Sequence, residues 1–250
     1  MVYDDIVVLT GAGISAESGI PVFRGETGLW ENEPVEAVAT YEGFARDRKR
    51  VHDFYNKMRQ SVKTKEPNPA HKALGRLEEE CGKKGYRYTL VTQNIDDLHE
   101  KGGSKNILHM HGKLYSLLCE SCQSRIAGFD GDSTTEQECP LCHKKAMRPD
   151  IVWFGEMPYY MDRIQMALMT CKLFISIGTS GVVYPAAGFC AMARNCGAYC
   201  VEFNLEHSQT ASNFDRGIYG KAGTTLPVFV DKLISSNFDL DIDALKIGEG

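Results

Sequence analysis

The chain has 250 residues, 43% of them hydrophobic and 24% charged, which is typical of a globular protein with one full-sized α/β core or a core with a small satellite. A net charge of -5 and a pI near 5.8 provide no diffuse positive field and argue against direct binding of nucleic acid or of an anionic membrane. No basic segment leads into an apolar stretch at the start, and no run approaches the ~20 apolar residues of a membrane span, so we expect a cytoplasmic protein without membrane association.

The first predicted element is a buried strand at Ile6–Thr10, which runs directly into a glycine-containing turn. Residues 11–16 fit the pattern G-x-G-x-x-A, whose backbone can approach a pyrophosphate at the start of the following helix. Taken alone, the motif fits a plain strand-to-helix turn equally well. A dehydrogenase would next need a second strand ending in an acidic residue ~20 residues on. The chain continues instead with a loop containing proline and glycine, residues 19–25, which argues against hydride transfer.

Strand-like and helix-like segments then alternate along the chain. Further apolar runs predict buried strands at 88–92, 173–177 and 199–203. A helix is expected from Asn68 and Pro69, a cap followed by proline at the first helical position, with an apolar stripe formed by Ala70, Ala73, Leu74 and Leu77. This alternation predicts an α/β fold with a doubly wound parallel sheet. Residues 28–67, which we interpret as charged helices without a strand, and 113–147 interrupt it and predict a smaller inserted lobe.

Small or amide-bearing residues follow three of the predicted strands. Gln93-Asn94-Ile95-Asp96 follows one strand, and 178–180 and 204–206 follow two others. The carboxyl ends of the strands in a doubly wound sheet share one edge, so these segments should converge on a ligand crevice. The alternatives are a helix cap formed by the Asn or Asp side chain and a plain turn at 178–180.

Two pairs of cysteines predict a zinc site with Cys119, Cys122, Cys139 and Cys142 as ligands, because each Cys-x-x-Cys turn presents two sulfurs to one tetrahedral ion. Four thiolates leave no open position, so the zinc should be structural, and His111 should be free to act as a general base. His111 could also be a satisfied core histidine or a competing zinc ligand. Acidic residues between the pairs weaken a nucleic-acid-binding role for this module. The other five cysteines lack disulfide spacing and favour free thiols in a reducing compartment.

The chain resembles the sirtuins, and in particular their bacterial and mitochondrial-type branch often called class III. The resemblance spans from about Val7 to about Leu233 and rests on an ordered set of motifs: G-A-G-I-S at 11–15, F-R at 23–24, Q-N-I-D at 93–96, H-G at 111–112, the cysteine pairs, V-W-F-G-E at 152–156, G-T-S at 178–180 and N-L-E at 204–206. It implies an NAD-dependent protein lysine deacylase. The implied organisation is a Rossmann-like NAD-binding large domain (1–27, 68–112 and 148–250) and a small domain with a helical module (28–67) and a zinc-binding module (113–147).

The resemblance also implies the residues of the site. NAD would be held by Gly11, Ala12, Gly13, Phe23, Arg24, Trp30, Gln93, Asn94, Ile95, Asp96, Gly178, Thr179, Ser180, Asn204, Leu205, Glu206 and Ala222. The acyl-lysine substrate would be bound by Tyr55, Met58, Val152, Trp153, Phe154, Gly155 and Glu156, with residues 152–156 pairing with the peptide as an added strand. His111, Asn94 and Asp96 would be catalytic. His111 would take a ribose hydroxyl proton, and the products would be nicotinamide, free lysine and O-acyl-ADP-ribose.

The acyl preference depends on one helical pair. Relatives in this branch that prefer succinyl- or malonyl-lysine carry Tyr-x-x-Arg, which binds the distal carboxylate. Here Met58 stands at the arginine position after Tyr55, and Arg59 lies one residue later, about 100° further round the helix. We therefore expect removal of neutral acyl groups, acetyl and longer ones, with Ala39 leaving the pocket roomy. The alternatives are a desuccinylase or demalonylase that uses Tyr55 and Arg59, or a plain core role for Tyr55 and Met58.

Two rival functions are consistent with parts of this pattern. The same NAD site could serve a mono-ADP-ribosyltransferase acting on a protein nucleophile. The cysteine pairs could belong to a catalytically silent zinc-containing interaction module, although the presence of Asn94, Asp96 and His111 together argues against it. The oligomeric state is not predicted.

Overall fold

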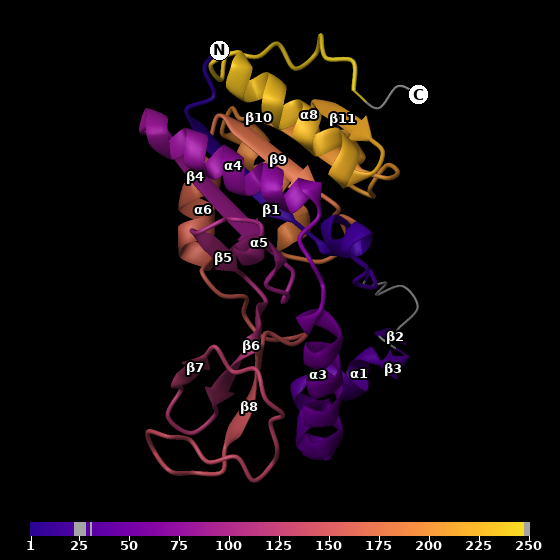
Figure 1. Ribbon diagram of the computed structural model, residues 1–250, viewed down its shortest axis with the longest axis vertical. Coiled ribbons are helices and arrows are strands. Elements are labelled where there is room, and N and C mark those ends of the chain that lie inside the picture. The colour runs from indigo at the N-terminus through magenta and orange to yellow at the C-terminus, as the bar shows by residue number, and fades with distance from the viewer. Residues whose placement is uncertain (23–28, 31, 248–250) are drawn as a thin grey trace.

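The computed structural model describes residues 1–22, 29, 30 and 32–247 of the chain. Figure 1 shows a large domain built of helices around a sheet, and a smaller lobe that extends from one end of it. This arrangement confirms the predicted α/β class with a doubly wound sheet and an inserted lobe. No helix in the described ranges is both long and apolar enough to span a membrane.

A parallel sheet of six strands forms the centre of the large domain, in the order β11-β10-β9-β1-β4-β5. Its strands are β1 (Asp5–Thr10), β4 (Arg87–Thr92), β5 (Ile107–His109), β9 (Leu173–Ile177), β10 (Tyr199–Asn204) and β11 (Arg216–Tyr219). Every residue of β1 is buried, because β1 lies in the middle of a sheet that is covered on both faces. The sequence predicted β1, β4, β9 and β10 but not β5 and β11, which are short strands at the two edges of the sheet.

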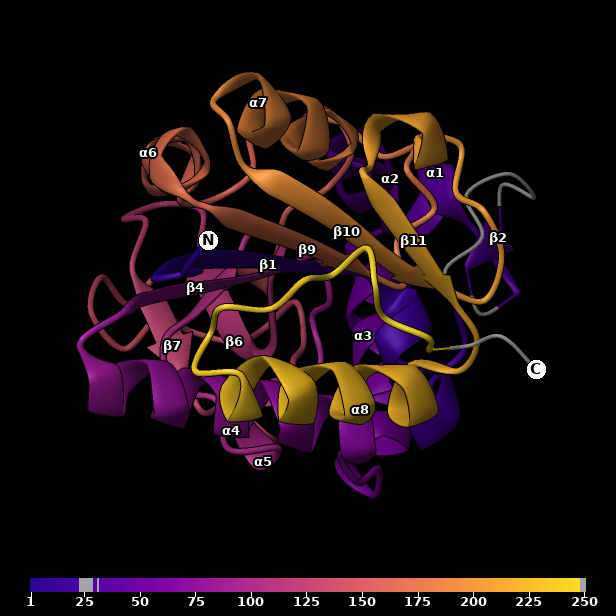
Figure 2. The same cartoon turned by 90° about the horizontal axis from the view of Figure 1, so that it is seen from above.

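Helices cover both faces of this sheet (Figure 2). α4 (Pro69–Lys84) and α8 (Ala222–Ser235) lie on one face, whereas α6 (Met161–Thr170) and α7 (Phe189–Asn195) lie on the other. The side chains that alternate along the strands accordingly form two separate apolar cores, one under each pair of helices. Within the described residues, the other helical segments of this domain are α5 (Leu98–Lys101) and the 3-10 helices at Ala12–Ser18, Ala186–Gly188 and Ala211–Asn213.

α4 begins and packs as the sequence predicts. Asn68 Oδ1 accepts a hydrogen bond from the Ala70 N–H, and Pro69 occupies the first helical position. The predicted apolar stripe is buried in the core shared with α8. Gly85 ends the helix in the left-handed conformation with φ 70°, which a residue with a side chain rarely adopts.

The smaller lobe combines helices from one part of the chain with strands from another. Its helices are α1 (Val35–Val38), α2 (Tyr41–Arg46) and α3 (Arg48–Lys63), and its antiparallel sheet has the order β7-β6-β8, with β6 at Gly112–Cys119, β7 at Arg125–Ala127 and β8 at Met147–Ile151. Phe44, Phe54 and Tyr55 from the helices share a core with Leu114 and Trp153. The two parts are therefore packed together as one lobe.

Two details of this lobe differ from the sequence-based expectations. The expectation that residues 28–67 contain no strand is wrong, because β2 (Leu29–Trp30) and β3 (Glu33–Pro34) pair as a short hairpin. The predicted boundary at 148 falls inside β8, which pairs with β6 of the lobe. The sequence around Arg148 and Asp150 alternates apolar and charged residues, which is compatible with a strand in either sheet. It therefore does not show that β8 belongs to the sheet of the small lobe.

Candidate active site

The turns that follow β1, β9 and β10 are hydrogen-bonded to one another at a single edge of the sheet. The Gly13 N–H donates to the Gly178 carbonyl at 2.9 Å, and the Gly178 N–H donates to the Phe203 carbonyl at 2.9 Å. Asn204 Nδ2 donates to the Thr179 carbonyl at 2.8 Å. The predicted segments at 178–180 and 204–206 are therefore brought together with the glycine turn after β1, as expected for a doubly wound sheet.

Glycine is required at Gly13 and Gly178 because the two backbones approach closely. A Cβ atom on Gly13 would lie 2.7 Å from the Gly178 Cα, and a Cβ on Gly178 would lie 2.5 Å from the Ile14 nitrogen. Gly178 also has φ 63°, in the left-handed region. The glycines thus let one turn pack on the next, in addition to any approach to a ligand.

Asn94 and Asp96, after β4, are linked through Ser15. Asn94 Nδ2 donates to the Gly11 carbonyl at 3.1 Å and to Ser15 Oγ at 3.2 Å, and Ser15 Oγ donates to Asp96 Oδ2 at 3.1 Å. Burial raises the pKa of the Asp96 carboxyl, although the hydrogen bonds from the Leu98 N–H and Ser15 oppose the shift. Ser15 was not among the predicted site residues, although it lies within the G-A-G-I-S motif. Its hydroxyl group was the only feature that could have indicated a role.

The His111 side chain is held by the backbone that precedes Asn94. Its Nδ1 lies 3.1 Å from the Gln93 carbonyl oxygen, which can only accept, so Nδ1 carries the proton and Nε2 keeps a lone pair in the neutral ring. Burial lowers the pKa of the His111 imidazole, and the bond to the Gln93 carbonyl partly offsets this. A neutral imidazole with an unprotonated Nε2 is the form that a general base needs.

A single cavity of about 1790 Å³ brings these groups together. Its lining includes the sheet-edge residues Gly11, Ala12, Ser15, Gln93, Asn94, Ile95, Asp96, His111, Gly178, Thr179 and Ser180, and the small-lobe residues Trp30, Ala39, Tyr55, Met58 and 152–156. It exceeds the ~300–1,000 Å³ of an ordinary small-molecule pocket, which leaves room for a dinucleotide and an acylated side chain together. The glycine turn, the amide and carboxyl groups and the imidazole fit the donor and acceptor chemistry of NAD.

Among the described residues, five that are predicted to bind NAD do not line this cavity. Asn204 reaches it indirectly through the Thr179 carbonyl, Leu205 is 64% exposed, and Glu206 is also on the surface. Ala222 is the first residue of α8 and packs at the margin of the core beneath that helix. Gly13 packs against the Gly178 backbone, as described above. Phe23 and Arg24 lie outside the described residues.

The small-lobe wall of the cavity includes Tyr55 and Met58, the helical pair on which the expected acyl preference depends. Tyr55 is fully buried, and its hydroxyl accepts a hydrogen bond from Trp153 Nε1 at 3.1 Å, whereas Met58 lines the cavity. Arg59 points elsewhere. Its guanidinium donates to the Leu114 and Gly131 carbonyls, each at 2.9 Å, and so joins α3 to the zinc-binding module.

Residues 152–156, which are predicted to pair with the peptide as an added strand, are themselves hydrogen-bonded within the chain. The Val152 N–H donates to the His111 carbonyl, the Phe154 N–H to the Ala39 carbonyl and the Glu156 N–H to the Trp153 carbonyl. Any backbone pairing with a peptide must therefore use the carbonyl groups and Gly155. Both carboxylate oxygens of Glu156 accept from Arg148, at 2.7 and 2.8 Å, so that its side chain supports the wall.

The four predicted zinc ligands form one cluster in the small lobe. Their sulfurs all lie within 4.8 Å of one another, with Cys119 to Cys142 and Cys122 to Cys139 each at 3.7 Å. Tetrahedral coordination with Zn–S bonds of about 2.3 Å requires sulfurs about 3.8 Å apart, so the geometry fits one structural zinc ion. The hydrogen bond with Ser124 lowers the pKa of the Cys139 thiol, whereas burial raises that of the Cys119 thiol. His111 belongs to the cavity and not to this cluster.

Comparison with known proteins places this chain in one family. Residues 11–185 match the Sir2 family, and the chain belongs to that family. It is 54% identical over 236 residues to a protein of Vibrio vulnificus (strain YJ016) described as an NAD-dependent protein deacylase, covering 93% of this chain and 95% of the relative. Among solved structures, a Sir2 homologue–NAD complex superposes with a TM-score of 0.84 at 35% identity, covering 94% and 91% of the two chains. A Sir2–p53 peptide–NAD⁺ complex gives 0.75 at 28% identity, with 93% coverage of each.

Proposed function

We propose that this protein is an NAD-dependent protein deacylase that transfers the acyl group of an acylated lysine to ADP-ribose and releases nicotinamide. The observation that carries the proposal is the shared cavity, which joins the glycine turn after β1, the Asn94 and Asp96 side chains and the His111 imidazole to an apolar wall from the small lobe. The family and the description of the Vibrio relative support it.

We propose that the residues divide the reaction between them as follows. The turns at Gly11–Gly13 and Gly178–Ser180, with Gln93 and Trp30, bind NAD, and Asn94 and Asp96 hold its reactive end in the hydrogen-bonded frame made with Ser15. When bound, NAD supplies an ADP-ribose electrophile that has nicotinamide as its leaving group. His111 Nε2 accepts the proton of a ribose hydroxyl, since its Nδ1 is already committed to the Gln93 carbonyl. The adenosine end would extend toward Asn204–Glu206 and Ala222, with Phe23 and Arg24 contributing from outside the described residues.

The preferred acyl groups are proposed to be neutral. Met58 supplies a flexible apolar surface, and the Tyr55 hydroxyl is bonded to Trp153. Arg59 does not line the cavity, and its guanidinium is bonded to the Leu114 and Gly131 carbonyls. A distal carboxylate placed against the Tyr55 and Met58 side chains would meet no charge on either of them, and burying an unpaired carboxylate there is costly. The desuccinylase alternative is therefore disfavoured.

The substrate partners are proposed to be acyl-lysine-bearing proteins, and the compartment to be the cytoplasm. Thiolate ligands and free cysteines are maintained in reducing compartments, and all nine cysteines, which lie within the described ranges, are unpaired.

Product analysis by mass spectrometry tests the proposal. One peptide is prepared with acetyl-, butyryl-, myristoyl- and succinyl-lysine and incubated with NAD and the enzyme. We expect free lysine, nicotinamide and O-acyl-ADP-ribose from the neutral peptides, with at least ~10-fold lower kcat/KM for the succinyl peptide. A succinyl preference would contradict the argument from Met58. Nicotinamide release with stable ADP-ribosylation of protein would favour the mono-ADP-ribosyltransferase, and absence of NAD binding would favour a silent interaction module.

A further inference from the structure

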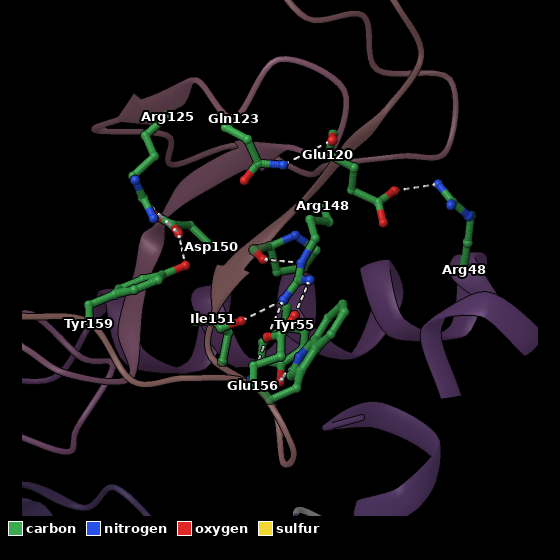
Figure 3. Close-up of polar contacts among 12 residues, drawn as sticks. Arg48, Tyr55, Glu120, Gln123, Arg125, Arg148, Asp150, Ile151, Glu156 and Tyr159 are labelled. Atoms are coloured by element: carbon green, nitrogen blue, oxygen red, sulfur yellow. Dashed lines mark hydrogen bonds and ion pairs between the residues drawn. The ribbon is translucent and has the colours of Figure 1, made fainter. Parts of the chain in front are cut away.

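β8 carries two buried residues of opposite charge that reach the wall of the cavity. Arg148 and Asp150 are two positions apart, so their side chains leave the same face of the strand. Their side chains are only 5% and 6% exposed. Figure 3 shows both among the polar contacts between this strand and the segment that follows it. Neither was singled out by the sequence, because nothing in the pattern R-P-D indicates what a buried charge will pair with.

Arg148 is held by its own strand and by the segment that follows it. Its guanidinium forms a bidentate pair with Glu156, at 2.7 and 2.8 Å, and donates to the Ile151 carbonyl at 2.8 Å. The same group stacks on the Trp153 ring with its central carbon 3.5 Å from the ring centroid. Bidentate pairing and stacking both require the planar fork of arginine.

The contacts of Glu156 extend this arrangement to the acyl-pocket wall. Glu156 Oε2 also accepts a hydrogen bond from the Trp153 N–H at 2.9 Å, and Trp153 Nε1 donates to the Tyr55 hydroxyl at 3.1 Å. A continuous chain of contacts thus leads from Arg148 through Glu156 and Trp153 to Tyr55. All three residues beyond Arg148 line the cavity.

Asp150 makes a second attachment further along the same segment. Its Oδ1 accepts from the Tyr159 hydroxyl at 2.9 Å and its Oδ2 from Ser116 Oγ at 2.8 Å. The Arg125 guanidinium pairs with Asp150 at 3.3 Å and lies 4.5 Å from the centroid of the Tyr159 ring. Tyr159, like Glu156, lines the cavity.

The strand that bears both residues is paired directly with the metal-binding strand. Met147 pairs with Cys119, a zinc ligand, and Arg148 pairs with Leu118, the residue before it. The sheet braced by zinc is therefore the base from which Arg148 and Asp150 extend.

We propose that Arg148 and Asp150 are positioning residues that hold residues 152–159 as a preformed wall for the acyl-lysine substrate. This inference rests on the proposed deacylase function and adds to it a structural connection between the zinc site and the substrate wall. A preformed wall reduces the ordering cost of binding, so loss of either attachment weakens acyl-peptide binding, whereas NAD meets residues on other elements.

Steady-state kinetics of matched variants tests this inference. Arg148→Met removes the fork, and Lys145→Met makes the same replacement at an exposed ion pair of the same lobe, where Lys145 meets Glu136. We expect Arg148→Met to raise KM for an acetyl-lysine peptide about tenfold or more while KM for NAD stays within about twofold. Lys145→Met should leave both constants unchanged. The double variant Arg148→Met, Glu156→Gln should have a peptide KM no higher than that of Arg148→Met alone. Both substitutions remove the same Arg148–Glu156 pair, so their effects should not add.

Zinc content and two milder variants keep the test decisive. Each variant should retain one zinc per chain; if Arg148→Met does not, Glu156→Gln and Tyr159→Phe replace it, and each should raise the peptide KM selectively. Equal changes in both KM values, or no change in a folded zinc-loaded variant, would overturn the inference. A wild-type enzyme without activity on any acyl peptide would instead refute the proposed function, and direct titration of acyl peptide into the variants would still test the wall.

Discussion

At the scale of single residues, His111 combines partial burial with one fixed hydrogen bond. Burial lowers the pKa of its imidazole below the ordinary value near 6.5, and the Gln93 carbonyl determines which ring nitrogen carries the proton. The neutral form is therefore available at physiological pH, with Nε2 as the acceptor. The hydrogen bond to the Gln93 carbonyl is thus what holds the proton on Nδ1 and leaves Nε2 free to accept.

Replacement of His111 by tyrosine tests its assignment as the base. We expect turnover to fall by ~10²–10⁴-fold or more, because a positioned base contributes about that much, while NAD binding remains largely intact. In the wild-type enzyme, kcat/KM should decline on the acid side with a midpoint below ~6.5, since protonation removes the acceptor and the pKa is lowered. Turnover measurements and a fluorescence titration of NAD check this, and near-normal turnover in His111→Tyr would exclude the role.

At the scale of elements, Asn68 links α4 to the turn that follows β1. Its Oδ1 caps the helix by accepting from the Ala70 N–H, and its Nδ2 donates to the Ile14 carbonyl at 2.7 Å and to Ser18 Oγ at 3.1 Å. One buried side chain therefore satisfies groups of two elements that lie far apart in the sequence. The Asn-Pro pair in the sequence predicts the cap, but nothing in the sequence predicts the contact between Asn68 and Ile14.

Two substitutions of Asn68 separate these contributions. Asn68→Ala removes the cap and both donated bonds, and we expect a loss of about 2–3 kcal/mol in the free energy of unfolding. Asn68→Asp keeps the capping oxygen and should lose less, although the Ile14 carbonyl is then left without its donor. Urea unfolding at pH 7 measures both values. If Asn68→Ala and Asn68→Asp lose the same free energy of unfolding, the capping hydrogen bond contributes little to stability.

At the scale of the whole molecule, buried histidines make stability depend on pH. Burial lowers the pKa of His52 and of His71 to about 4. In the unfolded chain each would titrate near 6.5, so between these values the unfolded state binds more protons. Stability is thus complete above pH ~6.5 and is lost as pH falls toward 4, by at most about 3 kcal/mol for each histidine.

Thermal unfolding between pH 7.5 and 4.5 checks this expectation. The melting temperature should fall as pH falls through this range, and His52→Gln should reduce the slope, because one proton-linked group is removed. Constant stability from pH 7.5 to 5 would show that the two histidines are not buried in the neutral form.

Much of the fold could be predicted from local sequence patterns, because secondary structure and helix starts depend on residues that are close together in the chain. The strand at Ile6–Thr10, the helix start at Asn68 and the four zinc ligands depend on apolar runs, one cap and one spacing, and the fold and zinc predictions are confirmed. The short edge strands were missed because three or four residues carry no distinctive period.

The amino-acid sequence by itself determined the fold class, the four-sulfur metal site and the groups that converge at the carboxyl ends of the strands, since strand direction places those ends on one edge. The tertiary structure decided which of these groups share the cavity, where Arg59 points, and that Arg148 and Asp150 support its wall. Those outcomes depend on contacts between residues far apart in the chain, and neither spacing nor residue type specifies the partner of a buried charge.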